Sequence, residues 1–285
     1  MAGAFGTACG RVGFDAASQD AAVPSGPFEA PQEITELSSA GDDDDPTLTA
    51  DMLEIYFAST RTSGMGGISD LFSSTRASVD EPWSPPVFVT ELNTATNEES
   101  PGISPDGLTL WFSRATGANP DLYVTTRTAR GQPWNPPVLV TELNTTDLEL
   151  SPEPARDGLR IAFYRETPRV LYEATRATPT SLWNSAVRIS ELSDPVYGHK
   201  SPFFVSDREL WLAWNPSGTY DLYRAIRPAP DQPFGLPMLV EGTDLNIAGA
   251  DDDDPWLSPD GATLVMSSSR PELGKQKIYI AHRSP

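Results

Sequence analysis

The sequence predicts an all-β fold: a five-bladed β-propeller of four-stranded blades, closed by an N-terminal strand that completes the last blade. Three observations predict it: a unit that recurs every 50 to 55 residues, period-two alternation of apolar residues, and 28 prolines among 285 residues. Such repeats are typical of propellers and solenoids. Alternation indicates strands with one buried face, and prolines at this density disfavour long helices.

Each unit opens at a proline that follows Asp or Ser, and a turn then leads into an alternating strand. In the second unit the turn is Ser104-Pro105-Asp106-Gly107, and Leu108, Leu110 and Phe112 follow it. Pro fixes φ and Gly tolerates positive φ, so this sequence favours a tight turn. The opening prolines are Pro46, Pro101, Pro152, Pro202 and Pro255.

A third and a fourth strand are expected at constant places in the unit. The third carries Asp-Leu-Tyr or a close variant, with an arginine six residues after its first position: Arg76, Arg127, Arg176, Arg227 and Arg283. We interpret these five arginines as structural ties between strand ends or neighbouring units. The fourth strand follows a Trp-x-x-Pro turn at Trp83 and Trp134, and Trp183 and Phe234 open the two degraded copies.

The last unit has only three strands, and its fourth is expected from the opposite end of the chain. The segment 33–37, Glu-Ile-Thr-Glu-Leu, matches Thr90-Glu91-Leu92 and Thr141-Glu142-Leu143 of the complete units. A ring closed in this way leaves only short, protected sheet edges. We therefore expect one propeller domain over residues 27–285, whose ring would open if residues 24–40 were deleted.

The units Ser-Pro-x-x-Ser-Pro-Asp-Gly, Leu-x-Phe-Ser, Asp-Leu-Tyr and Trp-x-x-Pro resemble the WD40-like PD40 repeats of TolB-type β-propellers. The second unit, Ser100 to Asn144, matches best, and the resemblance covers Pro27 to Arg283. It implies a binding protein of the bacterial periplasm or cell envelope, or a secreted one, that serves as a platform for interactions. TolB itself has six blades, so its partners are not carried over to five units.

Charge and composition exclude several classes of function. With 20 basic against 40 acidic residues the chain carries a formal charge of −20, which repels nucleic acids. No apolar run approaches the length of a transmembrane helix, and we expect a monomer. Residues 1–26 are expected to be a flexible segment, and Cys9 in Gly6-Thr7-Ala8-Cys9-Gly10 leaves a truncated export or lipoprotein signal open as an alternative to an ordinary terminus.

Acidic residues precede the opening proline in four of the five units. Oxygen ligands arranged in a ring suit Ca²⁺, so one hypothesis is a cation near the channel mouth. The alternative is that these acids accept hydrogen bonds from backbone amides at the blade junctions. The proposed metal ligands are Asp43, Glu98, Glu149 and Asp252.

The fourth unit departs from the repeat, which marks it as a candidate ligand site or a poorly formed blade. It has His199 in the acidic slot, and Trp214-Asn215 where the other units have Arg61, Arg114, Arg165 and Arg270. Those four arginines lie at offsets that differ by two residues, so they cannot all share one position without local insertions. The candidate ligand-binding residues are His199, Trp211, Trp214, Asn215 and Glu99, although aromatic residues on strands are more often core.

These features favour a non-catalytic binding propeller that takes a protein, peptide or small ligand, with Ca²⁺ as its candidate cofactor. The alternative is a carbohydrate-active propeller, either a glycoside hydrolase or lyase using channel carboxylates or a lectin with tryptophan pockets between blades. Against an enzyme, the acids recur with the repeat. No Gly-rich phosphate loop, Gly-x-Ser-x-Gly elbow or His-Glu-x-x-His motif occurs in the sequence.

Overall fold

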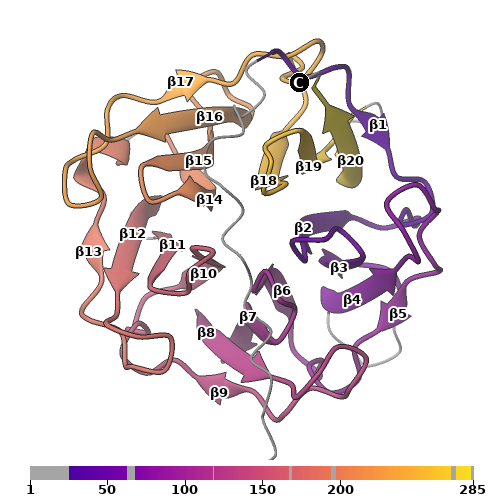
Figure 1. Ribbon diagram of the computed structural model, residues 1–285, viewed down its shortest axis with the longest axis horizontal. Helices are drawn as coiled ribbons and strands as arrows, with labels where there is room; N and C mark the ends of the chain where they lie inside the picture. The colour runs from indigo at the N-terminus through magenta and orange to yellow at the C-terminus, as the bar shows by residue number, and fades with distance from the viewer. Residues whose placement is uncertain are drawn as a thin grey trace, which may run out of the picture.

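Five four-stranded antiparallel sheets form a closed ring in a computed structural model (Figure 1). The structure describes residues 26–62, 68–117, 119–166, 169–193, 197–270 and 274–283. The predicted five-bladed propeller is confirmed. The expected N-terminal segment, including Cys9, lies outside the described residues except for Gly26. Within these ranges, no helix is long and apolar enough to cross a membrane.

The innermost strand of each blade faces the central axis, and the chain then runs outward through the blade (Figure 1). Blade 1 is β2 (Asp43–Leu48), β3 (Glu54–Ser59), β4 (Asp70–Thr75) and β5 (Val87–Phe88). Blade 2 is β6 (Glu98–Ile103), β7 (Thr109–Thr116), β8 (Asn119–Thr126) and β9 (Val138–Leu139). Blade 3 is β10 (Glu149–Pro154), β11 (Arg160–Glu166), β12 (Arg169–Thr175) and β13 (Val187–Arg188), followed by the 3-10 turn η1 (Ser190–Leu192). Blade 4 is β14 (His199–Ser206), β15 (Glu209–Trp214), β16 (Asp221–Ile226) and β17 (Met238–Leu239). Blade 5 is β18 (Asp252–Leu257), β19 (Thr263–Ser268), β20 (Lys277–His282) and the N-terminal β1 (Gln32–Glu33).

The opening proline of each unit lies inside the innermost strand and forms a β-bulge there. In blade 2 the pairing of β6 with β7 shifts between Glu99 and Gly102, on either side of Pro101. Proline cannot donate to the ladder, so a bulge is one of the few places that accept it within a sheet. The residue before each proline adopts a left-handed conformation with φ between 49° and 53°: Asp45, Ser100, Ser151, Ser201 and Asp254.

In blades 2, 3 and 5 the turn after the innermost strand ends in a glycine at positive φ, as the pattern predicts, whereas in blade 4 Asp207 and Arg208 connect the paired Ser206 and Glu209. In blade 2, Ser104 Oγ donates to Asp106 Oδ1 at 2.6 Å, and Gly107 has a φ of +73°. Blade 1 has no glycine here, and Met52 takes up the left-handed conformation with a φ of 56°. This non-glycine residue at positive φ is the less favourable version of the same turn.

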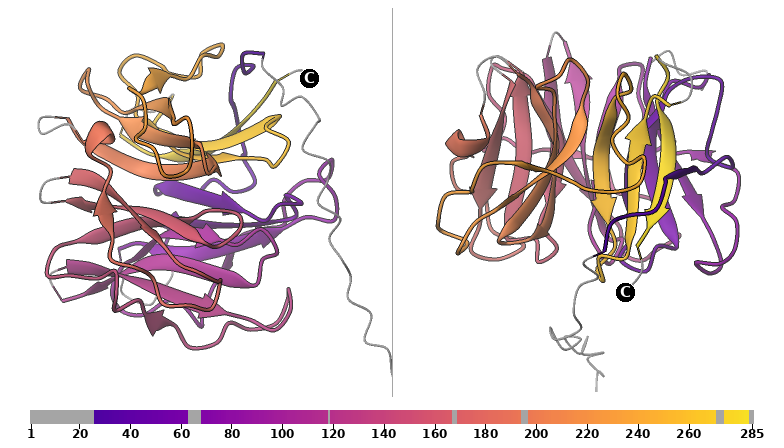
Figure 2. Two further views of the ribbon diagram at one scale, coloured as in Figure 1. Left: turned by 60° about the vertical axis from the view of Figure 1, so that its left-hand side comes forward. Right: turned by 90° about the horizontal axis from the view of Figure 1, so that it is seen from above.

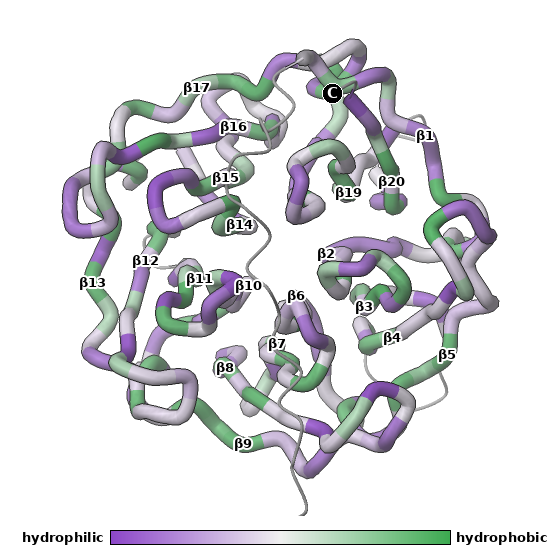
Figure 3. The backbone as a smooth tube through the Cα atoms, in the orientation of Figure 1, coloured by the Kyte–Doolittle hydropathy of each residue, from purple (hydrophilic) through white to green (hydrophobic). Residues whose placement is uncertain are grey.

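Hydrophobic cores fill the spaces between neighbouring blades, and hydrophobic segments recur from blade to blade (Figure 3). Between blades 1 and 2, Tyr56 and Leu71 pack with Ile103, Leu110 and Phe112. A strand of one blade thus contributes one face to each of two cores, and β3 is buried along its whole length. The inner strands therefore bury both faces, not only the one face that the alternation predicted.

The N-terminal strand closes the ring as predicted, beside β20 (Figures 1 and 2). Gln32 pairs with Ile280, and Ile34 N donates to the Ile278 carbonyl at 2.9 Å. Phe28, 1 % exposed, packs edge-on against Trp211 of blade 4 at 6.1 Å. The closing segment therefore joins blades 4 and 5 through its side chains as well as through the ladder.

The repeated arginine has the structural role that the sequence predicts. In every blade its guanidinium lies 4.1–4.7 Å from the centre of an aromatic ring, and its Nε donates to a carbonyl of the turn after the first strand. The ring belongs to Trp83, Trp134, Trp183, Phe234 or Phe28, and these aromatic residues are buried under the arginines.

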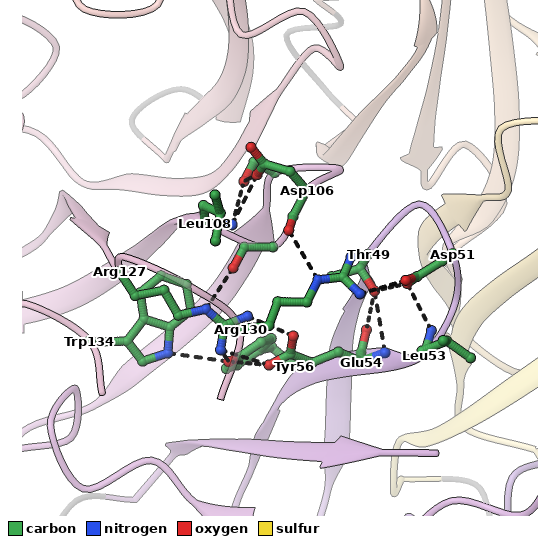
Figure 4. Close-up of polar contacts among 12 residues, drawn as sticks. Thr49, Asp51, Leu53, Glu54, Tyr56, Asp106, Leu108, Arg127, Arg130 and Trp134 are labelled. Atoms are coloured by element: carbon green, nitrogen blue, oxygen red, sulfur yellow. Dashed lines mark hydrogen bonds and ion pairs between the residues drawn. The ribbon is translucent and has the colours of Figure 1, made fainter. Parts of the chain in front are cut away.

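Arg127 additionally binds the neighbouring blade (Figure 4). Its Nη1 and Nη2 donate to Glu54 Oε1 and Oε2 at 2.9 and 2.6 Å, and Nη1 also reaches the Tyr56 hydroxyl at 3.1 Å. Trp134 Nε1 donates to the same hydroxyl at 3.2 Å. This bidentate ion pair joins blades 1 and 2.

Candidate functional site: the central channel

The four predicted metal ligands each contact an arginine of their own blade. Asp43, Glu98 and Glu149 are fully buried and lie 2.6, 2.8 and 2.9 Å from Arg61, Arg114 and Arg165. Asp252 pairs with Arg270 in the same way.

Each carboxylate also accepts a backbone N–H from the loop that enters its blade. The donors are Ser39, Thr94, Thr145 and Ile247. These contacts match the alternative role, acids that hold the blade junctions. The calcium site expected at these four residues stays a prediction.

The four arginines do not share one place in the ladder, but their guanidinium groups reach equivalent carboxylates. Glu98 lies directly opposite Arg114 in the ladder. Asp43 lies opposite Ser59, which donates to it at 2.6 Å, and Arg61 reaches back from two residues further along. Aspartate is one methylene shorter than glutamate, and the serine and the displaced arginine together fill that difference.

Blade 4 fills the same position with two aromatic rings in place of an ion pair. His199 lies opposite Trp214 in the ladder, and their rings stack 5.4 Å apart at 10°. Trp214 is half-buried, and its Nε1 is enclosed with no acceptor among the residues that the structure describes. Asn215 Oδ1 accepts the Gly218 N–H at 2.8 Å and so closes a turn.

Trp211 does not join this aromatic group. It is buried on the other face of β15, in the core with Phe28, and its Nε1 donates to Glu209 at 2.9 Å. His199 is likewise only 2 % exposed. The five predicted ligand-binding residues are therefore not brought together at one site. Glu99 and His199 lie on the innermost strands β6 and β14, and neither lines the cavity at the axis.

The residues that meet at the axis are those directly before the prolines. A cavity of about 340 Å³ lies within the five innermost strands, and Asp45, Ser100, Ser151, Ser201 and Asp254 line it together with Thr47, Glu153, Phe203, Trp256 and the five prolines. The proline bulge and the left-handed backbone explain why a residue two positions after the expected ligand faces the channel.

These axial residues form an incomplete hydrogen-bonded ring. Ser151 Oγ lies 3.4 Å from Ser100 Oγ, and Ser100 donates through its N–H to Asp45 Oδ2 at 3.0 Å. Asp45 is hydrogen-bonded to Asp254, which also accepts from the Ser201 hydroxyl. Two carboxyl groups in direct contact share a proton more readily than both ionise.

Burial, followed by the charge of Asp254, raises the pKa of Asp45 well above its ordinary value. Burial opposes ionisation of Asp254 too, but the Lys200 charge and the Ser201 hydroxyl outweigh it and hold its pKa below the ordinary value. The shared proton is therefore on Asp45. Burial also raises the pKa of Asp44, one residue earlier, to about 8.

Lys200 supplies the positive charge closest to this group. Its Nζ lies 2.5 Å from Asp253 Oδ2 and 4.7 Å from the centre of the Tyr220 ring. Asp44, Glu99 and Asp253 hold the corresponding place in three other blades, and Leu150 holds it in blade 3. Acids thus outnumber the one ammonium in this layer of the channel.

The channel carboxyls predict an unusual pH dependence of stability. The folded-state pKa of Asp44, about 8, exceeds its ordinary 3.8, so between about pH 4 and 8 the folded state holds more protons than the unfolded chain. Stability is then lost as pH rises through this window. We expect the melting temperature to fall from pH 5 to pH 9, and Asp44→Asn to raise it at pH 9 with little effect at pH 5. The exposed Asp80→Asn is the control, and equal curves for both variants would contradict this assignment.

Sequence reasoning missed Asp45, Asp254, Ser100, Ser151, Ser201 and Glu153. The available signal was the residue immediately before each repeated proline, which is always Asp or Ser. In the part of the chain that the structure describes, no group of three or more His, Cys, Asp or Glu side chains is arranged to hold a metal ion.

No protein-family model matches the chain, and no curated protein matches it. Solved structures do resemble it. TolB from Acinetobacter baumannii superposes with a TM-score of 0.53 at 17% identity, over 87% of this chain and 56% of the other. The chain thus spans just over half the length of that TolB. The α-L-arabinofuranosidase PaAbf62A from Podospora anserina gives 0.59 at 12% identity, over 91% and 97%.

The catalytic domain of a GH62 α-L-arabinofuranosidase from Coprinopsis cinerea gives a TM-score of 0.56 at 12% identity, over 91% and 95% of the two chains. At these identities the likeness shows the fold alone. By fold this chain is a β-propeller that is similar both to TolB and to α-L-arabinofuranosidase structures.

Proposed function

We propose that the protein is a non-catalytic binding propeller whose channel receives a positively charged group of a peptide, protein or small ligand. The observation that carries the proposal is the Asp45–Asp254 contact on the axis, in a cavity whose layer of acids has Lys200 as its one nearby ammonium. Without the shared proton the two carboxylates would repel each other, and a cation bound in its place would be attracted to both.

The expected ligand group is an ammonium or guanidinium. Lys200 is an example within the molecule: its ammonium lies against one carboxylate and one aromatic face, a combination that suits organic cations. Ca²⁺ is the alternative cation, and Asp45, Asp254 and the serine hydroxyls would supply its oxygen ligands. A location in the bacterial envelope or outside the cell accompanies this proposal, from the TolB-type resemblance.

The test uses n-butylamine and CaCl₂ as separate probes of the wild-type protein. We expect butylamine binding, measured by ligand-observed NMR, to weaken at least tenfold in Asp45→Asn/Asp254→Asn. Asn tolerates the left-handed backbone, so this variant should fold. The control Asp80→Asn/Glu81→Gln replaces two carboxyl groups by amides at exposed positions. Because binding displaces the proton of Asp45, butylamine affinity should rise from pH 6 to pH 8.

If both double variants lose butylamine affinity equally, binding depends on the overall negative charge of the surface. That outcome would contradict a site in the channel. Millimolar Ca²⁺ could instead raise the melting temperature of the wild type but not of Asp45→Asn/Asp254→Asn, while butylamine has no effect. That result would identify the bound cation as a metal ion. A ligand at 100 times its dissociation constant adds about 2.7 kcal/mol.

A carbohydrate-active propeller is the second candidate, favoured by one observation. Glu153 faces the cavity beside Phe203 and Trp256, and burial raises its pKa well above the ordinary value, as a general acid requires. Against it, the Asp45–Asp254 contact leaves no room for a sugar between those two carboxyls, which glycosidases keep about 5–10 Å apart. Turnover of a 4-nitrophenyl α-L-arabinofuranoside that is lost in Glu153→Gln would establish this candidate instead.

A further inference from the structure

A second hollow lies beside the turn between β10 and β11, where blade 3 departs from the repeat. Two other blades carry Pro105 and Pro259 in this turn, and blade 3 carries Arg156. The Arg156 side chain leaves its own blade, and its Nη2 donates to the Leu257 carbonyl of blade 5 at 2.6 Å. A guanidinium therefore reaches from blade 3 to the end of the innermost strand of blade 5.

Among the residues that the structure describes, the Leu257 carbonyl is the one hydrogen-bond acceptor of the half-buried Arg156 side chain. Its Nε is enclosed and has no acceptor, and no carboxylate lies within ion-pair distance of it among the residues whose placement the structure gives. Arg61, Arg114, Arg127 and Arg165, by contrast, each contact a carboxylate at 2.6–2.9 Å. A buried donor without an acceptor is costly and calls for an explanation, such as a bound ion or ligand group.

The hollow next to this arginine has a volume of about 390 Å³ and is lined by residues 155–157 and 204–207. Ala155 and Phe204 give it buried apolar walls. Its two acids have partners elsewhere: Asp157 Oδ1 accepts the Leu159 N–H at 2.8 Å, and Asp207 lies 3.8 Å from Arg160 Nε. Arg156 is the cationic group in this lining.

We propose that this hollow binds a small carboxylate with a short apolar tail, whose carboxylate pairs with Arg156. A carboxylate matches the donor geometry of a guanidinium, and the desolvated surroundings strengthen the charge-assisted bonds. The apolar tail would lie against Ala155 and Phe204. The site uses none of the axial carboxyls, so it stands or falls independently of the proposed function.

The test compares butyrate with butyramide on the full chain by ligand-observed NMR. We expect butyrate to bind and the uncharged amide to bind at least tenfold more weakly. Arg156→Gln should lose butyrate to the same extent, Arg156→Lys should retain part of it, and the exposed Arg188→Gln should bind like the wild type. Thermal melts of the three variants establish that each is folded.

Equal binding of butyrate and butyramide by the wild type would overturn the proposal without any variant. So would full butyrate binding by folded Arg156→Gln. Asp45→Asn/Asp254→Asn should keep butyrate and lose butylamine, whereas Arg156→Gln should do the reverse. Failure of one site is thus distinguishable from failure of the other.

Discussion

A chain lacking residues 24–40 is expected to lose its cooperative thermal transition. The deletion removes β1 together with Phe28, Ile34 and Leu37, which are 1 %, 7 % and 0 % exposed. Burying one such side chain contributes about 1.5–3 kcal/mol, so the three together approach the about 5–15 kcal/mol by which folded domains are stable. Circular dichroism during heating measures the effect.

Point variants grade the same effect. Phe28→Ala should lower the free energy of unfolding by about 3–5 kcal/mol, and Leu37→Ala should lower it by about 2–5 kcal/mol. Val187, on an outer strand, is 65 % exposed, so Val187→Ala should change this free energy little. An unchanged, cooperative melt of the deleted chain would refute closure by the N-terminal strand.

Arg127→Ala is expected to lower the free energy of unfolding by about 3–5 kcal/mol, since it leaves the Glu54 carboxylate buried without its partner. The two side chains are 3 % and 9 % exposed, and the Tyr56 hydroxyl and the Trp134 ring lose contacts at the same time (Figure 4). Chemical denaturation of the folded variant gives the difference.

Arg130→Ala is the matched control, because Arg130 makes an ion pair between the same two blades. Its pair with Asp51 is 34 % and 43 % exposed, and such pairs contribute about 0–1 kcal/mol. In a double-mutant cycle, Glu54→Ala should cost much less in the Arg127→Ala background than alone. Similar losses in Arg127→Ala and Arg130→Ala would contradict a dominant role for the buried pair.

Most of the fold could be predicted because the information is repeated. The proline step, the Asp-Leu-Tyr strand and its arginine occur in five copies, which allows the blade to be recognised. The last copy lacks a fourth strand, and the N-terminal segment matches the sequence of that strand. The stacking of Arg127 on Trp134 follows from the same constancy, since both positions recur together in the unit.

The channel site could not be assigned in this way, because facing direction is decided by backbone geometry. Asp43 and Asp45 are two residues apart and equally acidic, yet one is buried against Arg61 and the other faces the axis. The β-bulge formed by Asp45 and Pro46 interrupts the alternation that would otherwise give Asp43 and Asp45 the same facing direction.

The sequence by itself determined the number of blades, their strands, the N-terminal closure and the negative charge, all of which depend on local pattern and composition. Only the tertiary structure decided that Asp43 pairs with Arg61, that Asp45 meets Asp254, and that Arg156 crosses to Leu257. The last two contacts join residues of different blades, and their distances depend on how the ring closes, which no single repeat encodes.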